Sequence, residues 1–121
     1  MKVIVYNCRD QYALSRKQIE VIKKILPKEY FQPIKEFHIT HTCTGSEVFE
    51  YSKENKNAHF VFPVKEKTKE IVSNAVTELL IGLKRIKSST KWDYPISERE
   101  REEYMVFNNE WHSKCMLALQ K

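Results

Sequence analysis

Residues 71–86 read "IVSNAVTELLIGLKRI" and contain the strongest periodic pattern in the chain. Their apolar side chains recur every three or four positions, the spacing that places them on one face of an α-helix. They are Ile71, Val72, Ala75, Val76, Leu79, Leu80, Leu83 and Ile86. The pattern predicts a long helix over residues 66–87 that packs this face against the core of the protein.

The segments before this helix predict two parallel strands joined by a shorter helix. Residues 2–7, "KVIVYN", form a short apolar run typical of a strand buried on both faces. Ser15 and Gln18 have the capping-box spacing that begins a helix, and Pro27 ends it because proline has no N–H to donate. Residues 34–43, "IKEFHITHTC", then alternate between two faces as a strand does. A strand–helix–strand unit is a right-handed crossover between parallel strands.

The remaining segments predict a hairpin and a closing helix. Residues 47–52 and 57–64 are rich in aromatic and β-branched residues and are separated by the polar "KENK", so they are expected to pair as a hairpin. Pro63 indicates that the second of these strands is an edge or ends there. Ser97 and Glu100 have the spacing of a second capping box. An apolar stripe follows at Tyr104, Phe107, Trp111, Cys115 and Ala118. The order β-α-β-β-β-α-α predicts one α+β domain over residues 1–121 with a small mixed sheet.

The composition is that of a folded protein of the cell interior. Of the 121 residues, 41% are hydrophobic and 31% are charged, which is enough apolar material for one core and too little chain for two. No apolar run reaches the roughly 20 residues of a membrane span, and the apolar stretch at the start is too short for a signal peptide. The three cysteines include no CxxC pair and indicate reduced thiols. We therefore expect a cytoplasmic protein without a membrane partner.

The formal charge of +5 is unevenly distributed along the chain. Residues 1–91 contain 17 basic and 10 acidic residues, whereas residues 92–121 contain 4 basic and 6 acidic ones. A basic surface of this kind attracts nucleic acid or an acidic protein. Because no run of five like charges is present, the lysines are equally well explained as solubilising surface residues.

The long helix resembles the active-site helix of a minimal zincin-like metallopeptidase. In that family the helix carries HExxH, whose two histidines bind zinc while the glutamate activates water. Residues 77–81, "TELLI", keep the glutamate as Glu78 but have Thr77 and Ile81 in place of the histidines. Residues 14–39 resemble the lead-in of such domains, and residues 97–111 resemble the glutamate-bearing helix that often follows. The resemblance implies a zincin-like layout without the zinc ligands.

Another set of residues has the chemistry of a tetrahedral zinc site. "HTC" contains His41 and Cys43, and "HSKC" contains His112 and Cys115, so that together they offer two nitrogens and two sulfurs. The cysteines are equally suited to the core, and Cys115 lies on the apolar stripe of the last helix. We expect core cysteines and no bound metal. His38 and His59 fit no ligand pattern and receive no role.

Three functions remain open. The first is a non-catalytic binding or regulatory protein that contacts another protein, as small phage- or mobile-element-encoded proteins often do. The second is a nucleic-acid-binding protein that uses a basic and aromatic patch. The third is a metal-dependent hydrolase that uses Glu78 or the cysteine and histidine set. Phosphate-binding glycine motifs are absent, so we expect no nucleotide cofactor. Cys43 and His112 could form a nucleophile–base pair, but no Asn or Asp is visibly placed to orient the base, and we assign no catalytic residues. The candidate binding residues are Ile81, Lys84, Arg85, Lys87, Lys91, Trp92 and Tyr94.

Overall fold

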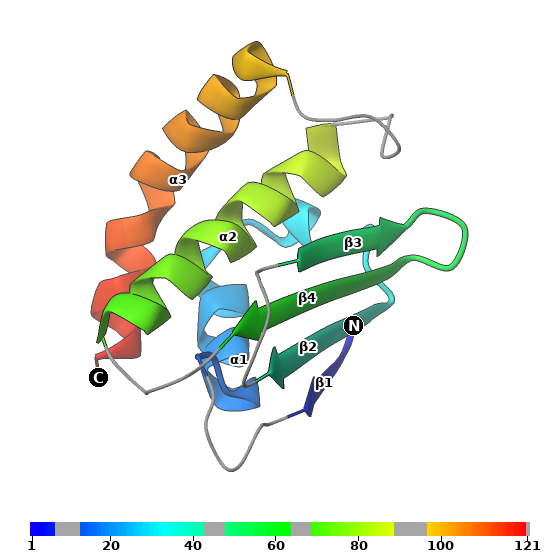
Figure 1. Cartoon of the computed structure of the whole chain (residues 1–121), viewed down its shortest axis with the longest axis horizontal. Coiled ribbons are helices and arrows are strands. Elements are labelled where there is room, and N and C mark those ends of the chain that lie inside the picture. Colours follow the sequence, from blue (N-terminus) through cyan, green and yellow to red (C-terminus); the bar gives the residue numbers. More distant parts are fainter. Residues whose placement is uncertain (7–12, 43–47, 64–68, 89–96, 121) are drawn as a thin grey trace.

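The computed structural model describes residues 1–6, 13–42, 48–63, 69–88 and 97–120. The predicted α+β class is confirmed, since helices pack on one mixed four-stranded sheet (Figure 1). In chain order the elements are β1 (Lys2–Tyr6), α1 (Arg16–Ile25), the short 3₁₀ helix η1 (Lys28–Tyr30), β2 (Glu36–Thr42), β3 (Val48–Ser52), β4 (Asn57–Pro63), α2 (Lys69–Ser88) and α3 (Glu98–Leu119).

The sheet has the strand order β1-β2-β4-β3. β1 and β2 are parallel, β2 and β4 are parallel, and β3 pairs with β4 in the antiparallel direction. The hairpin of β3 and β4 and the parallel pair of β1 and β2 are as the sequence predicts. β4 lies inside the sheet rather than at its edge, and Pro63 is its last residue. A proline is tolerated there because the ladder ends with it.

The first helix begins at the predicted capping box. The side chain of Ser15 accepts the backbone N–H of Gln18 at 3.2 Å, and the side-chain oxygen of Gln18 accepts the N–H of Ser15 at 2.9 Å. Leu14 and Ile19, on either side of the cap, are fully buried. The helix ends at Ile25, with Leu26 as its C-cap and Pro27 directly after it. Local sequence signals therefore fix both of its ends.

The core lies between one face of the sheet and the helices. In β2 and β4 every second residue is buried, including Phe37, Ile39 and Phe60. The apolar face of α2 covers them with Val76, Leu79, Leu80 and Leu83, as the periodic pattern predicts. α3 packs against α2 and α1 and lies along the side of α2 that is turned away from the sheet (Figure 1).

The prediction that the first strand is buried on both faces is wrong. Val3 is buried, but Lys2 is exposed and the side chain of Tyr6 is 51% exposed. The burial alternates along the sheet because the described helices all pack on the same face. An apolar run does not distinguish a strand covered on two sides from an edge strand whose second face meets solvent.

Candidate binding surface

The second face of the sheet is not covered by any described helix. The strand register arranges its side chains in three rows that cross β1, β2, β4 and β3 in that order. The rows are Lys2, Glu36, Asn57 and Ser52; Ile4, His38, His59 and Glu50; and Tyr6, Thr40, Val61 and Val48. None of these residues is buried. We call this set the open sheet face.

Ring side chains from β1, β2 and β4 contact one another on the open sheet face. The ring of Tyr6 is nearly parallel to that of His38, with an interplanar angle of 8° and 6.3 Å between ring centroids. The ring of His38 meets that of His59 at 67°, with centroids 6.1 Å apart. Thr40 Oγ1 lies 2.8 Å from His59 Nε2, and Glu36 Oε1 lies 3.5 Å from His38 Nε2. These contacts link the rings of Tyr6, His38 and His59 to one another and to the side chains of Thr40 and Glu36.

Two exposed side chains, Tyr6 of this group and Val48 on the opposite edge strand, project into solvent. Tyr6 on β1 is 51% exposed and Val48 on β3 is 44% exposed, although both lie in the same row of the sheet. The formal charges on the open sheet face come from Lys2, Glu36 and Glu50, so this face does not carry the basic excess of the chain. Its character is aromatic and hydrogen-bonding rather than basic.

The predicted basic and aromatic patch is only partly within the described residues, since Lys91, Trp92 and Tyr94 lie outside them. Lys84 Nζ lies 5.5 Å from the ring centroid of Phe107 and 5.8 Å from that of Tyr30. Ile81 and Arg85 are half-buried.

Lys87 also lies over Tyr30, and it forms an ion pair besides. Its Nζ is 5.4 Å from the ring centroid of Tyr30 and 3.0 Å from Glu29 Oε2. Lys84 and Lys87 thus contact groups of the protein itself, through cation–π contacts and an ion pair.

Thr77, Glu78 and Ile81 occupy three positions of the HExxH pattern on α2. Thr77 Oγ1 donates to the backbone carbonyl of Ser73 at 3.2 Å, one turn earlier on α2. Glu78 is half-buried and precedes the fully buried Leu79 on α2. Ile81 is half-buried one turn further on and has no lone pair for a metal.

His41, the first member of the alternative metal set, is buried on the helix-covered face of the sheet. Its Nε2 accepts the backbone N–H of Leu14 at 3.3 Å, and its Nδ1 lies 3.3 Å from the carbonyl oxygen of Tyr6. Both ring nitrogens therefore have backbone partners, which fixes the neutral tautomer with the proton on Nδ1. Burial lowers the pKa of His41 below its ordinary value, and the Tyr6 hydrogen bond opposes this only in part.

The other members of that set lie on α3 or outside the described residues. His112 Nε2 is 3.1 Å from both the hydroxyl and the carbonyl oxygen of Ser73. Cys115 is fully buried, and burial raises the pKa of its thiol to about 11, which keeps it protonated. Cys43 lies outside the described residues. Within the described ranges, no three histidine, cysteine or acidic side chains are grouped so that they could hold a metal ion.

The sequence analysis did not identify the central residues of the open sheet face. His38 and His59 lie side by side only because β2 and β4 are parallel neighbours, a pairing between strands that the β3 segment separates in the chain. The available signal was the alternation itself, which places His38 and Thr40 on the face opposite Phe37 and Ile39. The register that joins them to His59 is a property of the folded sheet.

No helix within the described part of the chain is both long and apolar enough to cross a bilayer. No protein-family model, no curated protein and no solved structure matches the chain.

Proposed function

We propose that this protein is a small, non-catalytic binding protein of the cytoplasm that regulates another protein by contacting it through the open sheet face. The observation that carries the proposal is the row of Tyr6, Thr40, Val61 and Val48, whose two outer side chains project into solvent beside ordered rings. A sheet with one face on the core ordinarily presents polar residues on the other. The exposed aromatic and apolar groups of this row are available to contact a partner.

The chemistry of the open sheet face suits a protein partner. Aromatic residues are enriched at the centres of protein interfaces, where they add contact area and keep a polar group for hydrogen bonding. Tyr6, His38 and His59 have this character, and their mutual contacts reduce the entropy lost on binding. Val48 would supply apolar area at the opposite edge of the sheet.

The nucleic-acid alternative has weaker support from the described residues. A phosphate backbone is bound mainly by lysine and arginine side chains that are free to reach it. The open sheet face offers Lys2 against two glutamates, and Lys84 and Lys87 already contact aromatic rings of the protein. We therefore favour a protein as the partner.

A photo-crosslinking experiment tests the proposal in cells that naturally carry the protein. A benzoylphenylalanine is placed at Tyr6 or Val48, and at Val106 as a control, because Val106 is equally apolar and 67% exposed on α3. We expect a discrete adduct from positions 6 and 48 and none from 106. Digestion of the adduct with protease or nuclease then gives the chemical class of the partner, and mass spectrometry identifies it.

The purified partner then allows a quantitative test. We expect Tyr6→Ser and Val48→Ser each to weaken binding about tenfold or more, which is about 1.4 kcal/mol. Val106→Ser should leave the affinity unchanged, and circular dichroism should show all three variants folded. Equal losses for all three variants, or none for the first two, would show that the open sheet face is not the contact. An adduct that nuclease removes would favour the nucleic-acid alternative.

The hydrolase alternative requires a separate measurement. We infer that the resemblance of residues 77–81 to a zincin helix is one of layout, with packing in place of metal binding. Accordingly, Glu78→Gln should leave the partner affinity and the fold unchanged. Peptide hydrolysis by the unmodified protein that disappears in Glu78→Gln, together with one equivalent of zinc after purification, would contradict this inference.

A further inference from the structure

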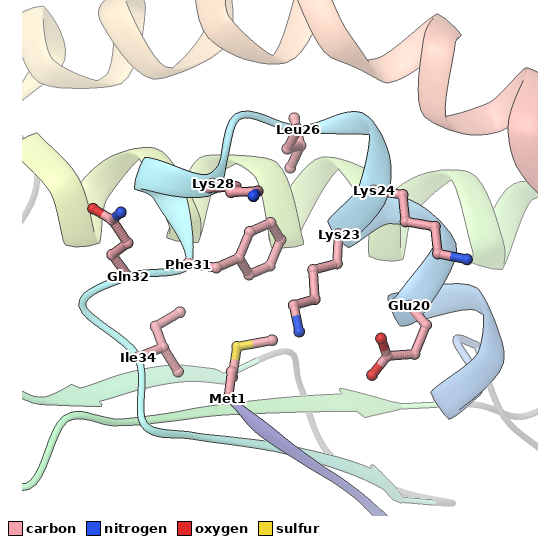
Figure 2. Close-up of a pocket in the computed structure, with 9 residues that line it drawn as sticks. All are labelled: Met1, Glu20, Lys23, Lys24, Leu26, Lys28, Phe31, Gln32 and Ile34. Atoms are coloured by element: carbon pink, nitrogen blue, oxygen red, sulfur yellow. The ribbon is translucent and has the colours of Figure 1, made fainter.

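A pocket of about 610 Å³ opens beside α1, where β1 begins (Figure 2). Leu26, Phe31 and Ile34 line it from the segment after α1, and Met1 closes it from the side of the sheet. Figure 2 shows the ring of Phe31 and the side chain of Lys23 entering it from opposite sides, while Lys24 and Gln32 extend away from its centre. It does not share a residue with the open sheet face.

The apolar lining of this pocket belongs to the main hydrophobic core. Leu26, Phe31 and Ile34 are each at least nine-tenths buried and form part of the same cluster as the α2 and sheet residues, and Met1 packs against that cluster. The pocket is therefore a hollow over the packed core, and each of these three side chains keeps a small exposed part at its floor. An apolar group placed there would extend the core and lose its own contact with water.

The border of the pocket is positively charged. Lys23, Lys24 and Lys28 line it against a single acidic residue, Glu20. Within the described ranges none of these four side chains forms an ion pair, in contrast to Lys87 with Glu29. Three cations without internal partners beside an apolar recess give a site complementary to a group that is negative at one end and apolar at the other.

We propose that this pocket binds a small amphiphilic anion, an alkyl or aromatic carboxylate whose apolar part lies on Phe31 and Ile34 and whose carboxylate meets Lys23 and Lys28. The volume falls in the range of about 300–1,000 Å³ usual for small-molecule sites. Lysine stems add apolar surface beside the recess while their ammonium groups stay in water. The proposal is independent of the open sheet face and of any protein partner.

Methyl NMR with octanoate below its micelle concentration tests this site. We expect saturable shifts of the Ile34, Leu26 and Met1 methyl signals. Acetate has the charge without the tail and 1-octanol has the tail without the charge, so each should bind at least tenfold more weakly. Lys23→Gln/Lys28→Gln should weaken octanoate binding about tenfold. The matched control is Lys17→Gln/Lys53→Gln, which removes two exposed lysines outside the pocket and should bind as the unmodified protein does.

Each other outcome would overturn the proposal. Equal affinity for octanoate and 1-octanol would mean that the lysines take no part, and equal affinity for acetate would mean that the recess takes no part. The same loss of octanoate affinity in the control variant would show that the loss comes from the lower net charge of the protein and not from the pocket lysines. Sedimentation with phosphatidylglycerol vesicles that requires Lys23 and Lys28, without saturable octanoate shifts, would place an anionic lipid surface there instead of a free ligand.

Discussion

His41 joins three separate segments through one side chain. Its imidazole lies on β2, accepts the N–H of Leu14 just before α1, and meets the carbonyl of Tyr6 at the end of β1. Both bonds require the neutral ring, because a proton on Nε2 would turn the acceptor for Leu14 into a second donor. Burial disfavours the charged ring as well and lowers the pKa of His41. The side chain is thus suited to a structural role at neutral pH.

The lowered pKa of His41 makes the stability of the fold depend on pH. As the pH falls below the ordinary value of 6.5, the unfolded chain takes up this proton while the folded protein does not. The unfolded state then binds more protons, so the free energy of unfolding decreases toward acid, from about pH 6.5 down to the folded pKa. Above pH 6.5 the contribution is fully present.

Urea unfolding between pH 8 and pH 5 measures this effect in the unmodified protein and in His41→Gln, whose amide can still donate and accept. We expect the unmodified protein to lose more stability than the variant below pH 6.5, by at most about 1.4 kcal/mol per pH unit. His41→Gln should be less stable at pH 8 and change less with pH. Parallel curves for the two proteins would show that the His41 pKa is the same folded and unfolded.

At the scale of the elements, α2 shows what the sequence could and could not predict. The helical spacing from Ile71 to Ile86 correctly predicts the buried face, because a helix keeps its period whatever it packs against. That spacing does not predict how closely α2 approaches the sheet. Gly82 is buried on α2, and a Cβ built there would lie 2.6 Å from Phe60 Cζ and 3.2 Å from Phe49 Cε2. The glycine allows the helix to lie directly on these rings.

The close contact at Gly82 leads to a prediction opposite to that of helix propensity. Alanine in place of a mid-helix glycine ordinarily stabilises by about 1 kcal/mol. Phe60, however, is fully enclosed and packs on Phe37, Phe49 and Phe62, so its ring has little room to move. Overpacking costs about 1–3 kcal/mol, and we expect Gly82→Ala to destabilise the protein in chemical denaturation.

Two further variants separate crowding from other causes. Asn74→Ala, at an exposed position of the same helix, changes propensity without crowding and should stabilise slightly. In a Phe60→Leu background the smaller side chain makes room, so Gly82→Ala should become neutral or stabilising, and the double-mutant cycle should show the coupling. If Gly82→Ala is equally destabilising in both backgrounds, the ring of Phe60 is not the cause.

Over the whole molecule, the α+β class could be predicted because each element carries its own local signal, such as the capping box at Ser15. The open sheet face could not, because it depends on which strands become neighbours. β2 and β4 are separated in sequence by β3 yet lie side by side, and this brings His38 opposite His59. Such long-range pairing is decided by the collective burial of the core rather than by any one segment.

The sheet forms one layer of the molecule and α3 forms the outer layer, with α1 and α2 between them. Urea unfolding can show whether these layers unfold together. α3 packs mainly on α2 and α1, and its buried side chains include Tyr104, Phe107 and Cys115. These residues meet the far side of the same helices that cover the sheet. Because α2 is shared by both layers, damage to its buried face should weaken both at once.

Leu79→Ala tests this shared role of α2. Leu79 is fully buried at the centre of the helix, and its truncation should cost about 2–5 kcal/mol of unfolding free energy. Leu117→Ala is the control, since Leu117 is 63% exposed on α3 and its truncation should change stability by no more than about 0.5 kcal/mol.

A second measurement follows α3 separately. In a Trp92→Phe background the fluorescence comes from Trp111, which packs beside Phe107 on α3 and reports on the outer layer. We expect fluorescence and far-ultraviolet circular dichroism to give coincident urea transitions in all variants, with Leu79→Ala shifting both by the same amount. A fluorescence transition that precedes the other would mean that α3 separates from a still-folded sheet and α2, and that the two layers do not form one cooperative unit.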